Sequence, residues 1–273
     1  MAHIIKKSTR NEGKSAWVFG GSEGIGLSIA EALAASGAKV VIISRSIDKL
    51  KKAVEKININ TGRDIDYKAI DICNFQNTRD LIDTLVAQRG TPDWVINCAG
   101  SCRPGYFKDL KLEHFEQMMT LNLMGTVHVC KAIEPHFRRA KKGHIVNTSS
   151  IAGFIPLFGY TGYSASKYAV KGFSRALRIE LKPFNIKVSL LCPPNTNTPG
   201  LETENLCKPQ AVLEAEEKLT PMDPEVVAQI VLKKLNGNPW LIIPGKDGWL
   251  AYVVNRISTR LINWLVRRPL NSI

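Results

Sequence analysis

Three residues suited to acid–base chemistry lie close together in the middle of the chain. Tyr163 and Lys167 stand four residues apart in the stretch GYSASKYAV, and Ser150 precedes the tyrosine by thirteen residues. Four residues is slightly more than one helical turn, so the phenol and the ammonium share one helix face. A nearby cation favours the phenolate, which makes a tyrosine with an ordinary pKa of about 10 usable as an acid or base near neutral pH. Ser150 is then placed to hold a carbonyl oxygen.

With Asn122 in TLNLMGT upstream, this triplet resembles the active site of the short-chain dehydrogenase/reductase family, and the resemblance spans most of the sequence. It implies that Tyr163 donates a proton to a ketone oxygen, while Lys167 binds the nicotinamide ribose and lowers the tyrosine pKa. It also implies that Ser150 orients the carbonyl and that Asn122 supports a proton relay through water. A Tyr-x-x-x-Lys pair alone is weak, because any amphipathic helix can carry one as a solvated pair. Ser150 and Asn122 together favour the catalytic interpretation, and the family spacing selects Ser150 over its neighbour Ser149.

Apolar stretches rich in β-branched residues alternate with segments of helical periodicity. Strands are expected in SAWVFGG, AKVVIIS, IDYKAID, PDWVINCAG, GHIVNTSS, IKVSLLCPP and WLIIP. The helices expected between them include one ending near Lys56, one over about 78–89, one from about Leu112 through Ala140, and the Tyr163 helix. Strands that are apolar on both faces predict an α/β protein, the doubly wound Rossmann fold, with a mostly parallel sheet and helices on both faces. Residues 195–224 interrupt the rhythm, and we expect them to be an insertion at the carboxyl edge of the sheet that covers the substrate.

The composition is that of a globular chain, and one domain over residues 1–273 is expected. Hydrophobic residues make up 44% of the sequence, and its beginning, MAHIIKKSTRNEGK, contains no apolar run long enough for a signal peptide or a spanning helix. A cytoplasmic location is therefore expected. The six cysteines show no metal-ligand spacing, which predicts reduced structural thiols and no metal site.

The chain has a strong positive charge without a nucleic-acid-binding pattern. Lysine and arginine outnumber aspartate and glutamate by 37 to 24, giving a net charge of +13. The basic residues are spread along the chain, with small clusters at 138–142 and in RRPL near the end, and no basic stripe is interleaved with aromatic residues. Such clusters are usually solvated faces. The distribution argues against nucleic acid and leaves an anionic cofactor or a membrane surface as partners for the charge.

A glycine-rich turn follows the first expected strand in FGGSEGIG. Gly20, Gly24 and Gly26 allow a tight turn and a close approach of backbone N–H groups to a pyrophosphate, and the following helix adds a favourable dipole. Ser22 and Ile25 lie within the same turn. The G-x-x-x-G-x-G spacing matches the family, although Phe19 stands where the family often has threonine.

The end of the second strand, IISRS, favours NADPH over NADH. Where an acidic residue would bind the ribose of NAD, the sequence has Ser44 followed by Arg45, and an arginine with help from Lys49 suits a 2′-phosphate. The alternative is an ordinary surface arginine. The resemblance places further residues around the cofactor: Asp71, Ile72, Asn97, Ala99, Gly100, Pro193, Thr196 and Thr198. Pro194 replaces a glycine of the family pattern, which stiffens that loop and removes an N–H.

The loop after the sixth strand carries a more specific resemblance. PPNTNTPG at 193–200, with Glu204-Asn205 and Lys208-Pro209, is similar to the 3-ketodihydrosphingosine reductases within the family, with Asn195 and Asn197 replacing aspartates. This implies NADPH-dependent reduction of the C3 ketone of a long-chain lipid ketone, 3-ketodihydrosphingosine, in sphingolipid synthesis. Two other interpretations stay open: a reductase for another lipophilic ketone such as a 3-oxoacyl chain or a steroid, and a non-catalytic NADPH-sensing regulator. Retention of the whole catalytic triplet disfavours the regulator.

The C-terminal segment, 246–273, is predicted to be amphipathic, with a helix over GWLAYVVNRISTRLINWLVRRPL at 248–270. Its apolar side would carry Trp249, Val253, Ile257, Leu261, Trp264 and Leu265, and its polar side Arg256, Arg260, Asn263 and Arg267. Internal arginines disfavour a spanning helix, whereas tryptophan and arginine at the boundary suit an interfacial one. Two interpretations remain open: peripheral attachment of 249–268 to the cytoplasmic face of a membrane, and packing on the domain or on a partner subunit. The family resemblance implies a homo-oligomer, either a dimer or a tetramer.

Overall fold

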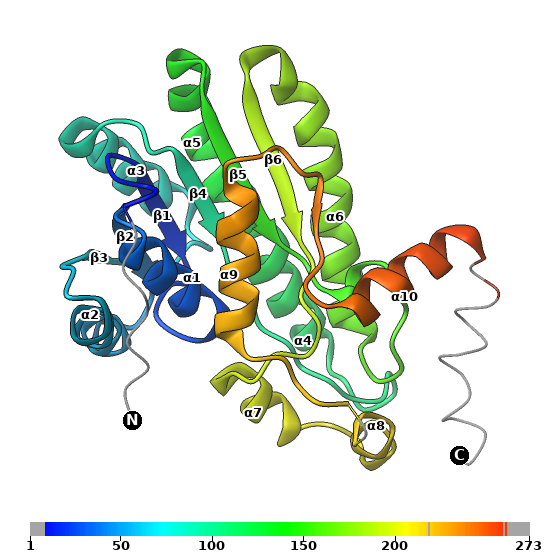
Figure 1. Ribbon diagram of the computed structural model, residues 1–273. Helices are drawn as coiled ribbons and strands as arrows, with labels where there is room; N and C mark the ends of the chain where they lie inside the picture. The colour runs from blue at the N-terminus through cyan, green and yellow to red at the C-terminus, as the bar shows by residue number, and fades with distance from the viewer. Residues whose placement is uncertain (1–8, 218, 259, 261–273) are drawn as a thin grey trace.

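A seven-stranded parallel sheet forms the centre of the molecule (Figure 1). The computed structural model describes residues 9–217, 219–258 and 260, and the statements below concern those residues. The strands follow the order β3-β2-β1-β4-β5-β6-β7. They are β1 (Ser15–Phe19), β2 (Lys39–Ser44), β3 (Asp66–Ala69), β4 (Trp94–Asn97), β5 (Gly143–Thr148), β6 (Ile186–Leu191) and β7 (Leu241–Ile242). The chain reverses direction across the sheet between β3 and β4, which defines the switch point of a doubly wound fold and confirms that prediction.

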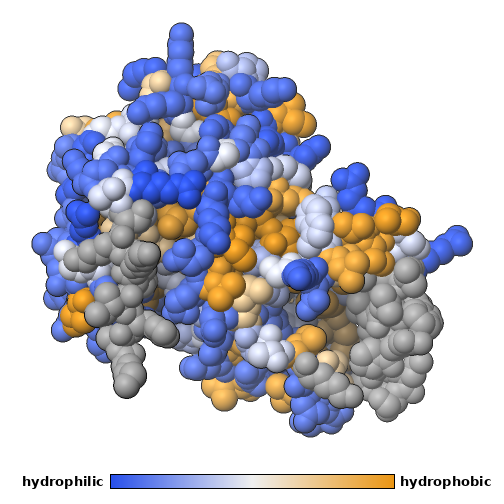
Figure 2. Space-filling model, in the orientation of Figure 1, coloured by the Kyte–Doolittle hydropathy of each residue, from blue (hydrophilic) through white to orange (hydrophobic). Residues whose placement is uncertain are grey.

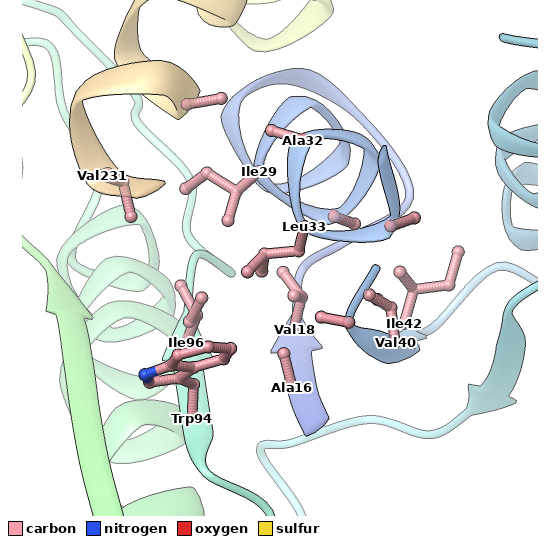
Figure 3. Packing of buried hydrophobic residues seen from close by; sticks show 14 of the residues in the cluster. Ala16, Val18, Ile29, Ala32, Leu33, Val40, Ile42, Trp94, Ile96 and Val231 are labelled. Atoms are coloured by element: carbon pink, nitrogen blue, oxygen red, sulfur yellow. The ribbon is translucent and has the colours of Figure 1, made fainter. Parts of the chain in front are cut away.

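Helices cover both faces of this sheet. One face carries α1 (Gly24–Ala35), α2 (Ile47–Thr61) and α9 (Pro224–Leu235), and the other carries α3 (Phe75–Arg89), α5 (Thr126–Ala140) and α6 (Thr161–Leu181). Alternate residues of each strand point to opposite faces, so both faces must be apolar to be buried. In β1, Ala16 and Val18 pack under α1 and α9, whereas Trp17 and Phe19 face α3 and α5. Figure 3 shows Val18, Leu33 and Ile96 meeting in the first of these layers.

Local signals explain why α2 and α3 extend beyond the predicted ends. The α2 helix continues past Lys56 because Ile57 and Thr61 are both buried, and Gly62 then ends it in the left-handed conformation that glycine adopts without strain. The α3 helix begins at Phe75, earlier than predicted, because the Asn74 side chain accepts a hydrogen bond from the Asn77 backbone N–H as an N-cap.

The segment predicted as one helix from Leu112 to Ala140 is interrupted. It consists of α4 (Leu112–Met118), a π-helical turn η1 (Met119–Gly125) and α5, with Asn122 inside the π-helical turn. Each π-helical turn inserts an extra residue into the helical repeat and changes the direction of the side chains that follow. Periodicity alone could not reveal this insertion, which lies at a residue that the sequence analysis assigns to the active site.

The insertion at 195–224 lies at the carboxyl edge of the sheet. It contains α7 (Pro199–Asn205) and α8 (Gln210–Glu216), which lie beyond the arrowheads of β5 and β6 in Figure 1. Two short 3₁₀ turns, η2 (Ile151–Gly153) and η3 (Lys182–Phe184), flank α6. Parallel strands of this fold bind ligands at this same edge, so the insertion is positioned over the ligand side of the sheet.

The last described helix, α10 (Lys246–Ile257), packs on the domain through one side. Ala251, Tyr252 and Val254 contact a small apolar cluster that includes Phe154 and Leu190, and the Asn255 amide donates a hydrogen bond of 2.7 Å to the Phe154 carbonyl oxygen. The prediction of one continuous helix over 248–270 is wrong in the described part, because α10 ends at Ile257 and Ser258 is extended. Residues 261–268 of the predicted membrane segment lie outside the described residues. Within the described ranges, none of the helices combines the length and apolarity needed to cross a bilayer.

Candidate active site

The α6 helix carries both members of the predicted Tyr–Lys pair. The Lys167 ammonium lies 5.5 Å from the centre of the Tyr163 ring and donates a hydrogen bond of 3.1 Å to the Thr148 carbonyl oxygen at the end of β5. Lys167 is only 4% exposed. Burial lowers its pKa to about 8, because a charged ammonium loses solvation in the protein interior. The lysine is thus fixed in place and still mostly cationic at neutral pH.

Burial raises the pKa of Tyr163 above that of free tyrosine, and the negative charges that Cys102 and Glu204 can carry act in the same direction. A hydrogen bond with Ser150 opposes this rise. The direction differs from the expectation that Lys167 would lower the tyrosine pKa, because loss of solvation on burial is the largest effect on the phenol. At neutral pH the phenol is therefore protonated, which is the state needed to donate a proton.

The two neighbouring serines have different environments. The Ser149 hydroxyl is 1% exposed and donates a hydrogen bond of 2.9 Å to the Lys167 carbonyl oxygen, which joins the end of β5 to α6. The Ser150 hydroxyl accepts a hydrogen bond of 3.2 Å from the Ala152 backbone N–H and is the hydrogen-bonding neighbour of Tyr163. Ser149 is committed to structure, and Ser150 is next to the phenol.

Asn122 is held in the π-helical turn by a set of short hydrogen bonds. Its amide oxygen accepts from the Ser101 backbone N–H at 2.8 Å, and its amide nitrogen donates to the Ser101 carbonyl oxygen and to the Ser166 hydroxyl, each at 2.9 Å. A methyl group at Gly100 would stand 3.1 Å from the Asn122 amide oxygen and 3.3 Å from the Lys167 ammonium. Asn122 and Lys167 therefore converge on one point beside Gly100.

The glycine-rich turn between β1 and α1 has no room for side chains. Gly20 has a φ of +79°, and a Cβ at this position would lie 2.4 Å from the Ala99 backbone nitrogen. A Cβ at Gly26 would lie 2.2 Å from the Gly20 carbonyl oxygen, and one at Gly24 would meet Thr198 at 3.0 Å. This backbone cradle at a helix N-terminus fits the pyrophosphate of a dinucleotide.

Cationic side chains lie near the end of β2, beside the glycine-rich turn. Ser44 at the end of β2 accepts a hydrogen bond of 2.9 Å from Ser22, and Arg45 is exposed beside it. The Lys49 ammonium pairs with Glu23 at 2.7 Å, a partner that the sequence analysis did not anticipate. Among the described residues Arg45 forms no ion pair within 4 Å. Its guanidinium is free to meet a phosphate, whereas Lys49 would have to share its charge.

A cavity of about 500 Å³ joins these parts. The predicted residues that line it are Gly20, Ser22, Gly24, Ile25, Gly26, Ser44, Arg45, Lys49, Asp71, Ile72, Ala99, Gly100, Tyr163, Lys167, Pro193 and Thr198. Four predicted residues are not among its lining: Asn97, Asn122, Ser150 and Thr196. Ser150 and Asn122 reach the site through the contacts described above.

Asn97 and Thr196 serve the framework around the cavity. The Asn97 amide donates a hydrogen bond of 2.8 Å to the Asn147 amide oxygen on the neighbouring strand β5. The Thr196 hydroxyl donates a hydrogen bond of 2.8 Å to the Pro194 carbonyl oxygen, and Thr196 is 4% exposed. Neither residue is among the cavity lining, and their contact with a cofactor stays a prediction.

Several lining residues were not assigned to the site by the sequence analysis. They are Glu23, Ile43, Ile70, Cys98, Ser101, Cys102, Leu121, Thr148, Ser149, Gly200, Thr203 and Glu204. Most directly adjoin a predicted motif at the end of a strand, and that position was the available signal. Glu204 is different, because the sequence analysis named it only as part of the loop resemblance, and it lines the cavity from α7 of the insertion.

Comparisons with known proteins agree with this architecture. Residues 14–207 match the family model of the short chain dehydrogenases. A 3-dehydrosphinganine reductase from Danio rerio is 36% identical over 251 residues, covering 90% of this chain and 76% of that protein. A 3-ketodihydrosphingosine reductase from Bos taurus is 37% identical over 85% of this chain and 71% of that protein. One from Dictyostelium discoideum is 35% identical over 87% of this chain and 78% of that protein.

Solved structures share the fold. A short chain dehydrogenase/reductase from Burkholderia phymatum in complex with NAD superposes with a TM-score of 0.81 at 22% identity, covering 92% of this chain and 96% of that one. An alcohol dehydrogenase from the archaeon Thermococcus sibiricus, complexed with 5-hydroxy-NADP, superposes with a TM-score of 0.72 at 26% identity, covering 84% of this chain and 95% of that one. The matched motifs, the sheet order and the extent of these similarities lead to one conclusion: the chain belongs to the short chain dehydrogenase family.

Proposed function

We propose that this protein uses NADPH to reduce the C3 ketone of 3-ketodihydrosphingosine to dihydrosphingosine, a step of sphingolipid synthesis. The observation that carries the proposal is the site itself, in which a protonated Tyr163, a buried Lys167 and Ser150 adjoin a dinucleotide cradle. The relatives named 3-ketodihydrosphingosine reductase support the choice of ketone.

The residues of the chain divide the work of ketone reduction. When bound, the reduced nicotinamide supplies a hydride to the carbonyl carbon. Tyr163 donates its phenolic proton to the carbonyl oxygen, and Ser150 holds that oxygen in line with the phenol. Lys167 stabilises the phenolate that remains and anchors the ribose. Asn122, fixed beside Lys167 at Gly100, supports return of the proton through water.

The choice of NADPH over NADH rests on Arg45. A guanidinium can form paired, charge-assisted hydrogen bonds with a 2′-phosphate. Arg45 lines the cavity beside Ser44 and has no ion-pair partner among the described residues. An acidic residue at the end of β2 would favour NAD, and this chain has Ser44 at that position. Initial rates with NADPH and NADH at equal concentrations measure this preference.

Product identification by mass spectrometry tests the proposed reaction. Purified protein, NADPH and 3-ketodihydrosphingosine should give dihydrosphingosine, with two hydrogens added to the substrate. A panel of ketones at equal concentration, including a 3-oxoacyl thioester and a 3-ketosteroid, measures selectivity. If one of the panel ketones were turned over much faster than the sphingoid ketone, the proposed substrate would be wrong even though the reductase chemistry stood.

We also propose that α10 attaches the protein to the surface of an anionic membrane. Its outer side exposes Trp249, Leu250 and Ile257, which are 52%, 62% and 81% exposed, and Figure 2 shows apolar side chains gathered over this helix. Beside α10 lies a groove lined by Tyr168, Lys171, Gly172, Arg175, Trp240, Tyr252 and Arg256, a set of described residues with three cations and no carboxylate. Apolar side chains next to cations suit an interfacial helix.

Self-association into a dimer or tetramer stays a prediction. The α6 helix exposes Ile179 at 65% and Tyr168 at 41% on its outer side, which offers apolar area to a second copy. Light scattering of the purified protein, with and without detergent, measures the oligomeric state. Detergent separates subunit association from lipid-like contacts of α10.

A further inference from the structure

A partly buried carboxylate lies in the same cavity as the catalytic tyrosine. Glu204, near the end of α7, lines the cavity together with Tyr163, Lys167 and Cys102. Its neighbours on α7 include Gly200 and Thr203, which also line the cavity, whereas Glu202 is exposed on the same short helix. The fold of the insertion therefore selects one of two nearby glutamates and turns it toward the reacting centre.

Glu204 has no cation of the protein as an ion-pair partner. Among the described residues none of the lysines, arginines or histidines lies within 4 Å of its carboxylate. The cation nearest in sequence, Lys208, is committed elsewhere: its ammonium lies 2.7 Å from Glu216 and 2.7 Å from the Asn205 amide oxygen. Glu216 is held in turn by Tyr160 at 2.9 Å and Asn195 at 3.0 Å. Lys208 and Lys167 still lower the pKa of the Glu204 carboxyl from a distance, but neither forms an ion pair with it.

The surroundings of Glu204 make its isolation costly. The Cys102 thiol is its hydrogen-bonding neighbour, and partial burial raises the pKa of the Glu204 carboxyl. The carboxylate also acts across the cavity, raising the pKa of Tyr163. A buried charge without a partner is unfavourable unless a ligand supplies the opposite charge. The cavity is thus complementary to a cation bound beside the phenol.

We propose that Glu204 is the subsite for the protonated amino group of the substrate. This inference rests on the proposed function, because 3-ketodihydrosphingosine carries an amino group on C2, the carbon bonded to the ketone carbon. That group is a cation near neutral pH and must lie close to the carbonyl oxygen that Tyr163 protonates. Glu204 then selects 2-amino ketones over neutral ketones of the same chain length.

The subsite also links substrate binding to the acid. An ammonium placed against Glu204 cancels the negative charge that disfavours ionisation of the phenol. Phenolate formation after proton transfer therefore becomes easier with an amino ketone in the cavity than with a neutral one. Glu204 is in this way expected to affect kcat as well as KM for the amino ketone.

Matched ketones and matched variants test the subsite. The ketones are 3-ketodihydrosphingosine, its N-acetyl derivative, and the analogue with hydrogen in place of the amino group. Glu204→Gln removes the charge and keeps the size, Glu204→Asp keeps the charge, and Glu202→Gln is the control on the same helix. Circular dichroism and NADPH fluorescence establish that each variant is folded and binds cofactor.

The wild-type protein and Glu202→Gln should both prefer the amino ketone. Glu204→Gln should lose about ten- to a hundredfold in kcat/KM on the amino ketone, as expected for a hydrogen bond to a charged group, with no loss on the two uncharged ketones. Glu204→Asp should retain part of the preference. An equal loss on all three ketones, or no loss at all, overturns the ammonium subsite while the proposed function stands. Failure of the wild-type protein to reduce the amino ketone rejects the proposed function itself, and the subsite with it.

Discussion

Replacement of Arg45 by leucine tests how much the 2′-phosphate of NADPH contributes to cofactor binding. The guanidinium is exposed, lines the cavity beside Ser44 and lacks an ion-pair partner among the described residues. Leucine keeps much of the side-chain volume and removes every donor. Arg63→Leu is the matched control, because Arg63 is a surface arginine paired with Glu12 at 3.7 Å, away from the lining of the cavity.

The magnitude follows from the exposure of Arg45. Each hydrogen bond between charged groups contributes about 1.5–3 kcal/mol where water is excluded, and a guanidinium can form two with one phosphate. Solvent screening at an exposed site reduces the sum to about 1–2 kcal/mol. Since about 1.4 kcal/mol corresponds to a factor of ten, Arg45→Leu should raise the KM for NADPH by about five- to thirtyfold.

Initial-rate kinetics at a fixed ketone concentration measure both cofactors in parallel. We expect the KM for NADH, which has no 2′-phosphate, to stay unchanged in Arg45→Leu, so that the preference for NADPH shrinks by the same factor as the NADPH affinity. Arg63→Leu should match the wild-type protein with both cofactors. An equal rise in KM for NADPH and NADH would refute the reasoning, because it would mean that Arg45 supports the fold of the site and not the phosphate.

Three other perturbations test the lysine, the glycine turn and the buried sheet. Since burial lowers the Lys167 pKa to about 8, kcat/KM should fall as the pH rises through 8 and the cation is lost, and Lys167→Arg should move that fall to higher pH. Gly26→Ala should lower the free energy of unfolding, measured in urea, by about 1–3 kcal/mol, because the new Cβ would lie 2.2 Å from the Gly20 carbonyl oxygen. Gly172→Ala is the control and should not lower this free energy, because a Cβ at Gly172 would have no atom within 4 Å. Burial lowers the His144 pKa to about 4, so between pH 6.5 and about 4 the histidine is protonated in the unfolded chain and neutral in the folded one. The free energy of unfolding should therefore fall by about 1.4 kcal/mol for each unit that the pH decreases in this range. His144→Asn should flatten that pH dependence.

The fold followed from the sequence because its signals are local. Strands that bury both faces are mostly apolar, as in the buried residues 16–19 of β1, and the turn at Gly20–Gly26 marks the first strand–helix junction. Where the predicted helix boundaries were wrong, the cause was tertiary packing or a single capping residue. The π-helical turn at Asn122 leaves no mark on periodicity, and α10 ends at Ile257 although the amphipathic pattern continues beyond it.

The candidate site was predictable where its residues belong to motifs and not where they meet through topology. Tyr163, Lys167 and the glycine turn each carry their own spacing. The raised pKa of Tyr163 depends on burial by segments far apart in the chain, and spacing holds no information on burial. Glu204 lines the cavity from α7 of the insertion, and its motif did not reveal that this helix lies over the sheet edge.

The central claim is that the Tyr163 phenol protonates the ketone. Its most direct test is the single-turnover rate of ketone reduction with NADPH in the wild-type protein, in Tyr163→Phe and in Tyr168→Phe, whose phenol lies on the same helix outside the cavity lining. We predict a loss of about 10²–10⁴ for Tyr163→Phe, unchanged NADPH binding, and a wild-type rate for Tyr168→Phe. A wild-type rate in Tyr163→Phe would contradict the account.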